Sequence, residues 1–255
     1  MTRPIALTIA GSDSSGGAGV AADLKTFAAL GVWGRLAITA VTAQDSAGVH
    51  AVEPVSVGVV VRQIEVAAAG ASALKVGMLA NAMIARSVGD ALGRIQPRNL
   101  VVDPVVRSSS GAILLEGGAD VLLPMLGLAA VVTPNLAEAA ALLGVAPAAT
   151  RDEMAEQATA LARRTQGAAL VTGGHLDGDT AADVLVSDGG DRVTWLEAPR
   201  IEGGDLHGTG CVLSAAIAAE LAKGVGLVAA CRHAKSFTSA AIERGMAAGL
   251  GSVSP

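Results

Sequence analysis

The chain is 255 residues long, carries a formal net charge of −5, and is 51% hydrophobic but only 16% charged. This length suffices for one large α/β domain or two small ones, and no apolar run reaches the roughly 20 residues of a membrane span, so we expect no membrane partner. Two Phe, two Trp and no Tyr leave few rings for base stacking, and the negative charge also argues against a nucleic-acid partner.

Along the chain, short apolar runs of strand length alternate with longer runs of helical period. The expected strands cover residues 5–10, 35–42, 73–79, 99–104, 129–134 and 168–174. The expected helices cover residues 19–30, 55–69, 81–95 and 150–164, with two more beginning near Thr209 and Leu227. Thr150 and Glu153 form a capping-box pattern. Residues 182–188 and 191–198, separated by Gly-Gly, predict a β-hairpin.

Strand–helix alternation over the whole length predicts a doubly wound, mainly parallel sheet with helices on both faces. No linker-like or repetitive segment interrupts the pattern, so residues 1–255 are expected to form one domain. Ligands of such sheets bind beyond the carboxyl ends of the strands, and candidate site residues should lie there.

The stretch "DLHGTGCVLSAAIAAEL" places glycines and Cys211 at the start of a helix. Its first turn, Gly208 to Cys211, would offer free N–H groups to an anion, and this setting would lower the pKa of the Cys211 thiol. An ordinary helix start is the alternative. Cys231 has no such setting and is expected to be a small core residue. Two cysteines are too few for a disulfide framework or a zinc site, and the N-terminus lacks a cleavage site, which favours a reducing cytoplasm.

Other candidates are less specific. The glycine-rich loop after residue 10 matches neither a Walker A loop nor a dinucleotide fingerprint. Asn135 and Glu138 suit a cation held through water, but equally a helix cap. Asp103 ends an apolar strand, where a carboxylate indicates a ligand site.

The order of these motifs carries more information than any one of them. "AGSDSSGGAGVAADLKTF", "TAVTAQDSAGV", "KVGML", "VVDPVV", "TPNLAEA", "GGH" and "HGTGCVLSAAIAAEL" together closely resemble the hydroxymethylpyrimidine/phosphomethylpyrimidine kinases of thiamine biosynthesis, in the ribokinase-like superfamily. The resemblance runs from about Pro4 to about Arg244. It implies a three-layer α/β/α ribokinase-like fold and a homodimer.

The resemblance also implies the chemistry: transfer of the γ-phosphoryl group of ATP, with Mg²⁺, to 4-amino-5-hydroxymethyl-2-methylpyrimidine, and a second phosphorylation of its monophosphate. It assigns catalysis to the first turn of the helix, with Cys211 where most of the superfamily carries an aspartate base; the set is Gly208, Thr209, Gly210 and Cys211. The residues implied for the pyrimidine are Gln44, Asp23, Met78 and Gly11. Those implied for the nucleotide are Asp103, Asn135, Thr172, His207 and Lys235. Asp103 and Glu138 are implied for the metal.

The chain departs from the family at two positions. Thr172 stands where the family has a lysine before "GGH", which implies either weaker ATP binding or compensation by another cation. Asp205 introduces a carboxylate near the phosphates, which would either disfavour ATP or help to hold a metal. We hypothesise that Arg107 replaces the lost positive charge, in which case Arg107→Ala should raise the KM for ATP. The segment 48–56 is expected to form a flap over the pocket.

Two other functions remain open from the sequence. A pyridoxine or pyridoxal kinase shares the fold and a hydroxymethyl acceptor, and a non-catalytic relative would bind the pyrimidine without transferring phosphate. Gln44 and Met78 favour the pyrimidine, because an amide pairs with a ring nitrogen beside an amine.

Overall fold

The computed structural model describes residues 3–45, 48–107, 114–174, 176, 178–204 and 206–255. Its centre is a sheet of eight strands in the order β12-β11-β10-β9-β7-β5-β1-β2. These strands are β1 (Ile5–Ala10), β2 (Trp33–Ile38), β5 (Ala73–Val76), β7 (Leu100–Val102), β9 (Val131–Val132), β10 (Ala168–Thr172), β11 (Thr180–Ser187) and β12 (Arg192–Pro199). Neighbours from β2 to β10 pair in parallel, whereas β11 is antiparallel to both β10 and β12. The mainly parallel sheet and the hairpin are therefore confirmed.

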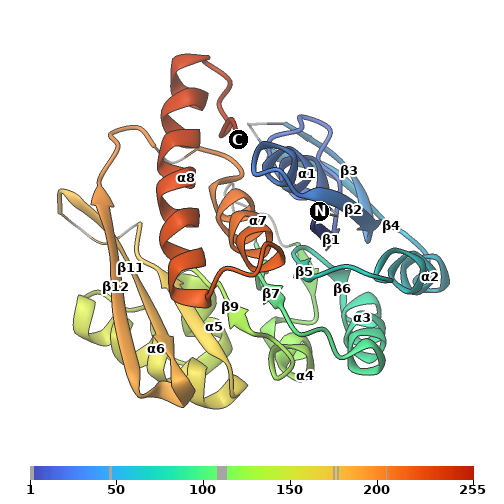
Figure 1. Ribbon diagram of the computed structural model, residues 1–255, viewed down its shortest axis with the longest axis horizontal. Coiled ribbons are helices and arrows are strands. Elements are labelled where there is room, and N and C mark those ends of the chain that lie inside the picture. Colours follow the sequence, from blue (N-terminus) through green and yellow to red (C-terminus); the bar gives the residue numbers. More distant parts are fainter. Residues whose placement is uncertain (1–2, 46–47, 108–113, 175, 177, 205) are drawn as a thin grey trace.

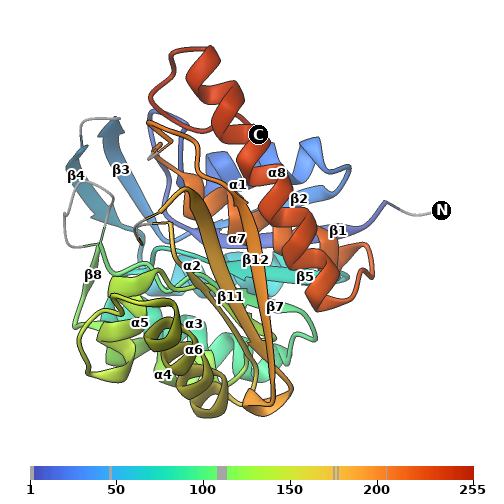
Figure 2. The same ribbon diagram turned by 90° about the vertical axis from the view of Figure 1, so that its left-hand side faces the viewer.

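Helices cover both faces of this sheet. One face carries α1 (Gly19–Ala29), α7 (Thr209–Ala222) and α8 (Leu227–Ala247), with α7 between the other two (Figure 1). The other face carries α2 (Val57–Ala67), α3 (Ala82–Ile95), α4 (Leu123–Leu126), α5 (Leu136–Leu143) and α6 (Arg151–Thr165) (Figure 2). The expected three layers are confirmed. No helix in the described part of the chain is long and apolar enough to cross a membrane.

Burial on both faces explains why the central strands are continuous apolar runs. All residues of β5 and β7 are buried, as expected for parallel strands covered on both sides. Three helices on one face of the sheet begin at caps that the sequence encodes. Asn81 caps α3, and capping boxes open α5 and α6, the latter formed by Thr150 and Glu153 as predicted.

The predicted strand over residues 35–42 was wrong in one respect: it divides at Thr39. Residues up to Ile38 belong to the main sheet, whereas β3 (Ala40–Asp45) leaves it and pairs antiparallel with β4 (Gly48–Pro54). Thr39 fixes the break, because its N–H donates to Ala10 and its hydroxyl to the Met78 carbonyl, at 3.0 and 2.7 Å. We call β3 and β4 the ribbon; it stands apart from the main sheet in Figure 2.

Small elements complete the fold. β6 (Ala80–Asn81) pairs in parallel with β8 (Leu115–Glu116), and one-turn 3₁₀ helices cover Ala119–Leu122 and Asp188–Gly190. The sequence pattern did not indicate these elements, because each is too short to show a period.

Candidate active site

The carboxyl ends of the parallel strands bring most of the candidate residues to one edge of the sheet. Gly11 follows β1, Met78 lies two residues after β5, Asp103 follows β7, and Thr172 ends β10. The start of α7 also reaches this edge, since Ser214 in α7 donates to Asp103 at 2.9 Å. The arrangement agrees with the rule that ligands collect at strand ends in such sheets.

The first turn of α7 is held by a glycine that no other residue can replace without movement. Gly208 is the N-cap with φ +89°, and a Cβ there would lie 1.8 Å from the Gly17 carbonyl oxygen. The helix itself begins at Thr209, whose N–H donates to Leu206 at 3.4 Å. The N–H groups of Gly210 and Cys211 also belong to the first turn and lack helical partners. Free N–H groups at a helix start, together with the helix dipole, suit the binding of an anion.

Two carboxylates lie near this turn. Asp103 is 5% exposed and accepts a hydrogen bond from the Ser214 hydroxyl, and a Cβ on Gly210 would lie 3.9 Å from the Asp103 Oδ2 atom. Glu138 is 9% exposed and forms the α5 capping box with Asn135, so the cap expected as one alternative for this pair is present. Burial raises the pKa of Glu138 to about 8, and the nearby Asp103 carboxylate adds to this rise.

This acidic pair fits Mg²⁺. A hard cation between two carboxylates removes the repulsion between their negative charges. Mg²⁺ is usually coordinated by one or two carboxylates together with waters and phosphate oxygens. Thr133 directly follows β9, the neighbour of the strand that Asp103 follows, and its buried hydroxyl has no partner in the described structure, so a water of such a cation would satisfy it. No group of three or more acidic, His or Cys side chains in the described residues could hold a metal by itself.

A buried ion pair underlies the same edge. Lys75 and Asp23 are both 0% exposed, and the Lys75 Nζ lies 2.9 and 2.8 Å from the two carboxylate oxygens of Asp23. Thr8 also donates to Asp23 at 2.5 Å. Burial alone would lower the pKa of Lys75, but the negative charge of Asp23, with a smaller contribution from Asp103, raises it. Asp23, expected against the pyrimidine, is thus occupied by Lys75 and Thr8.

Lys75 was missed by sequence reasoning, although a lone lysine inside the apolar run "ALKVGML" was a usable signal. A fully buried lysine almost always has a specific partner.

The expected thiolate at Cys211 is wrong. Burial of its sulfur raises the pKa of Cys211 to about 12, although the residue as a whole is partly exposed. The Asp23 and Asp103 carboxylates raise it further, and together these effects outweigh the Lys75 charge and the Gly19 N–H at the start of α1. The thiol is therefore neutral near pH 7. Cys231 is a buried core residue, as predicted.

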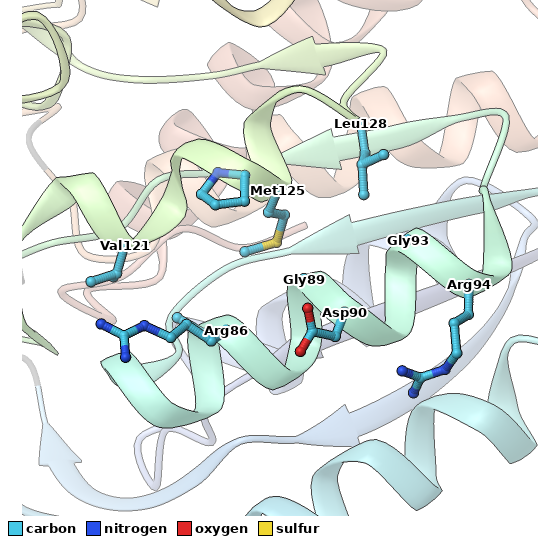
Figure 3. A pocket seen from close by; sticks show the side chains of 10 residues that line it. Arg86, Gly89, Asp90, Gly93, Arg94, Val121, Met125 and Leu128 are labelled. Atoms are coloured by element: carbon cyan, nitrogen blue, oxygen red, sulfur yellow. The ribbon is translucent and has the colours of Figure 1, made fainter.

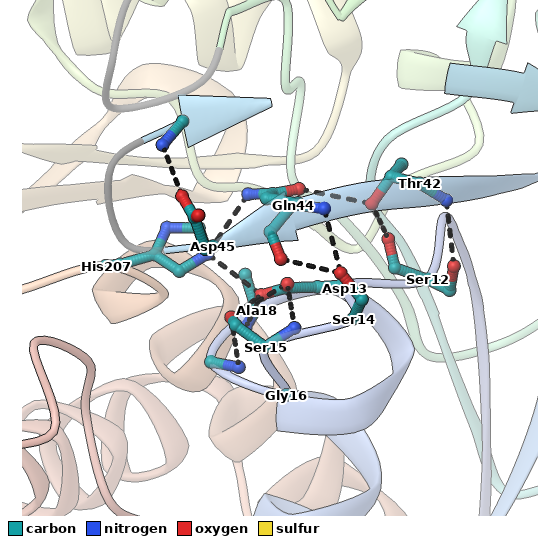
Figure 4. Close-up of polar contacts among 12 residues, drawn as sticks. Ser12, Asp13, Ser14, Ser15, Gly16, Ala18, Thr42, Gln44, Asp45 and His207 are labelled. Carbon is teal, nitrogen blue, oxygen red and sulfur yellow. Dashed lines mark hydrogen bonds and ion pairs between the residues drawn. The ribbon is translucent and has the colours of Figure 1, made fainter. Parts of the chain in front are cut away.

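The candidate pyrimidine residues lie around the glycine-rich loop. A Cβ on Gly11 would lie 2.7 Å from the Met78 sulfur, so Gly11 is needed for this approach. Gln44, in β3, is tied to the loop through Ser14, whose hydroxyl accepts from the Gln44 N–H at 2.8 Å. Gln44 also contacts His207 (Figure 4).

His207 was expected with the nucleotide residues, but the structure puts it with Gln44 and with Asp13. Its Nε2 atom lies 2.9 Å from Asp13 Oδ2 and 3.1 Å from Gln44 Nε2. Asp13 was not singled out from the sequence, because one aspartate in a loop of serines and glycines carries no periodic signal. Its side chain is 1% exposed.

The remaining nucleotide candidates lie together at the next strand ends. Asn135 and Thr172 form a β-bridge. Lys235 in α8 donates to Asp183 at 2.7 Å, and the other oxygen of Asp183 accepts from the Gly173 N–H at 3.1 Å. A cationic side chain thus lies at the end of β10, next to Thr172. Arg107 is exposed, and the hypothesis that it replaces the missing lysine stays a prediction. Asp205, and His175 in "GGH", lie outside the described residues.

A surface hollow of about 480 Å³ lies elsewhere, between α3 and the α4 region (Figure 3). Its lining consists of Ala85, Arg86, Gly89, Asp90, Gly93, Arg94, Val121, Pro124, Met125 and Leu128. None of the candidate site residues belongs to it.

Taken together, the strand-end residues can bind an anion at the start of α7, a divalent cation at Asp103 and Glu138, and a polar ring beside Gln44. An anion site next to a cation site suits phosphoryl transfer, in which the protein contributes positioning and charge stabilisation.

Comparison with known proteins agrees with this chemistry. A family model described as phosphomethylpyrimidine kinase matches residues 13–255. The hydroxymethylpyrimidine/phosphomethylpyrimidine kinase of Rhizobium meliloti is 50% identical over 242 residues, which are 93% of this chain and 90% of that protein. The Escherichia coli protein of the same name is 43% identical over 250 residues, 95% of this chain and 92% of its own length. The crystal structure of an ADP complex of Bacillus subtilis pyridoxal kinase has a TM-score of 0.84 and 38% identity, covering 94% of this chain and 92% of that one.

Proposed function

The chain belongs to the phosphomethylpyrimidine kinase family, and on this premise we propose that it phosphorylates 4-amino-5-hydroxymethyl-2-methylpyrimidine and then its monophosphate. The hydroxymethyl oxygen forms a bond to the γ-phosphorus of ATP, the bond to the departing ADP breaks, and the hydroxyl proton is released. The enzyme is a phosphotransferase with an alcohol or phosphate acceptor and acts in the supply of a thiamine precursor.

One observation carries the proposal most directly: the start of α7 meets Asp103 where the strands end. There, the N–H groups of Gly210 and Cys211 would bind the transferring phosphoryl group. Such preorganised donors stabilise charge that develops in the transition state. Thr209 and Gly208 shape the turn, the latter through its left-handed conformation.

We assign the other candidates by their place around this turn. Gln44, Met78 and Gly11 would contact the ring, while Asp23 would support that pocket through Lys75. For the nucleotide we propose Asn135, Thr172 and Lys235, together with Asp103. Asp103 and Glu138 would hold Mg²⁺, which supplies charge neutralisation between phosphate oxygens. Cys211 would lie beside the acceptor hydroxyl.

A coupled ADP-release assay tests the function. We expect ADP to form only when both Mg²⁺ and the pyrimidine alcohol are present, and turnover to stop when EDTA removes the metal. ADP formation without the alcohol would indicate an unrelated ATPase, and no ADP at all would favour a non-catalytic pyrimidine-binding protein.

A second acceptor deserves the same assay, because the chain is 38% identical to a pyridoxal kinase. Turnover of pyridoxal and of the pyrimidine alcohol should be compared under identical conditions. We expect a higher kcat/KM for the pyrimidine, since the amide of Gln44 can pair with a ring nitrogen and its neighbouring amine together.

We further propose that residues 1–255 act as one domain, that the protein is a homodimer, and that it works in the cytoplasm. The resemblance to the family supports the dimer, and two cysteines without a disulfide suit a reducing compartment. Sedimentation equilibrium across a range of concentrations tests the dimer, and a monomer mass at every concentration would refute it.

A further inference from the structure

Asp13, His207 and Gln44 form a chain of contacts that includes one of the proposed ring-binding residues, Gln44 (Figure 4). The chain continues through Thr42, whose hydroxyl oxygen lies 3.4 Å from Gln44 Oε1 and 2.8 Å from the Ser12 carbonyl oxygen. Proton counting along this chain settles which group donates at each contact.

At one end, Asp13 acts as an acceptor only. Its Oδ1 accepts from the Ser15 N–H at 2.8 Å and its Oδ2 from the Ala18 N–H at 2.7 Å. Burial would raise the pKa of Asp13, but hydrogen bonds from Ser15, His207 and Ala18 lower it below its ordinary value. An ionised carboxylate has no proton to give, so His207 Nε2 must carry the proton at the 2.9 Å contact.

At the other end, Thr42 has a single hydroxyl proton. The Ser12 carbonyl can only accept, so the Thr42 proton is used in that bond. The Thr42 oxygen is then left to accept from Gln44. The Gln44 group facing Thr42 must be the NH₂. The group facing His207 must be the carbonyl oxygen, because a protonated Nε2 atom has no lone pair with which to accept. Its single N–H is shared between Asp13 Oδ2 at 2.9 Å and the Gln44 oxygen at 3.1 Å. A half-turn of the amide about its last bond meets both conditions, and glutamine ends are assigned by such networks.

We infer that Asp13 and His207 are positioning residues, which fix the Gln44 amide with its oxygen toward His207 and its nitrogen toward Thr42. The backbone of His207 is itself held by the C-terminal segment, since its carbonyl accepts from the Val253 N–H at 3.1 Å. In this fixed orientation, one lone pair of the Gln44 oxygen and one N–H of its NH₂ group remain available to a ligand, at known positions. The amide therefore recognises a ring edge with an amine beside a ring nitrogen, which deepens the proposed function and rests on it.

The network can be tested without any substrate. In the ligand-free protein labelled with ¹⁵N, NMR should show a proton on His207 Nε2, and the Gln44 side-chain NH₂ should give contacts to Thr42. A bare Nε2 nitrogen with the Gln44 NH₂ against the His207 ring would overturn the inference. This result does not depend on whether the pyrimidine is the substrate.

The effect on specificity is tested with two acceptors in one enzyme. His207→Leu should lower the ratio of kcat/KM for the pyrimidine alcohol to that for pyridoxal about tenfold, the scale of one hydrogen bond. His207→Gln should restore most of the ratio, because its NH₂ can replace Nε2–H toward both neighbours. Any change in ATP binding cancels in this ratio, since both reactions use the same nucleotide.

Ser15→Ala is the matched control. It removes the hydroxyl bonds to the same Asp13 carboxylate, at 2.8 and 2.9 Å, and leaves His207 in place, so the ratio should stay near the wild-type value. If the ratio fell equally in Ser15→Ala, or did not fall in His207→Leu, the network would only stabilise the loop and would not set specificity. Absence of pyrimidine turnover in the wild-type enzyme would instead refute the proposed function. The NMR experiment would still test the orientation of the Gln44 amide independently.

Discussion

Replacing Lys75 by methionine should lower the free energy of unfolding by about 3–5 kcal/mol, the usual cost of removing one partner of a buried ion pair. Methionine has nearly the length of the lysine stem, so little packing is lost. The Asp23 carboxylate, however, would keep only the Thr8 hydroxyl as a partner in a site that is 0% exposed. Guanidinium denaturation followed by circular dichroism measures the change.

A second substitution separates charge from packing. Asp23→Asn in the Lys75→Met background removes the stranded charge while the amide still accepts from Thr8. We expect this double variant to recover about half or more of the loss, because the penalty for an uncompensated buried charge disappears. A loss of less than about 1 kcal/mol in Lys75→Met alone would mean that the pair contributes no more than a surface salt bridge.

Much of the fold was predictable because its signals are local. The apolar run at β1 and the capping box at Thr150 and Glu153 each act within a few residues, and both were placed correctly. The break at Thr39 was not predictable. It depends on hydrogen bonds to Ala10 and Met78, residues that only the folded sheet brings near.

The candidate site divides in the same way. Motif order singled out Asp103, Gln44 and the start of α7 as candidates. The strand end at Asp103 and the glycines before α7 are visible in sequence, whereas Gln44 came only from the family resemblance and lies within β3. Helix position alone predicted a low pKa for Cys211, whereas burial and the carboxylates of Asp23 and Asp103 reverse the shift. Likewise, the partnership of Asp13 with His207 joins residues far apart along the chain. Interactions between residues far apart in the sequence determine the pKa values and charge pairs of the site, and a local sequence pattern does not contain them.

Cys211→Ala should lower turnover of the pyrimidine alcohol by a factor on the order of 10², the usual cost of losing a positioned acid–base group. With a pKa of about 12, roughly one thiol in 10⁵ is ionised at pH 7. At pH values below that pKa, the fraction of Cys211 present as thiolate increases about tenfold for each unit by which the pH is raised. If the thiolate accepts the hydroxyl proton, kcat should therefore rise with pH. Initial rates from pH 6 to 9 measure this slope.

Two further variants decide what the thiol does. Cys211→Asp supplies the aspartate base that the family resemblance implies for this position, so it should retain more activity than Cys211→Ala and lose the rise of kcat with pH. Cys231→Ala is the matched control, because it removes the other buried thiol, which lies in α8 and away from the α7 turn; its turnover and pH profile should match the wild type. Near-wild-type turnover in Cys211→Ala would leave the N–H groups of the α7 turn as the catalytic element and give the thiol a packing role. A flat pH profile combined with a hundredfold loss in Cys211→Ala would show instead that the neutral thiol orients the acceptor hydroxyl.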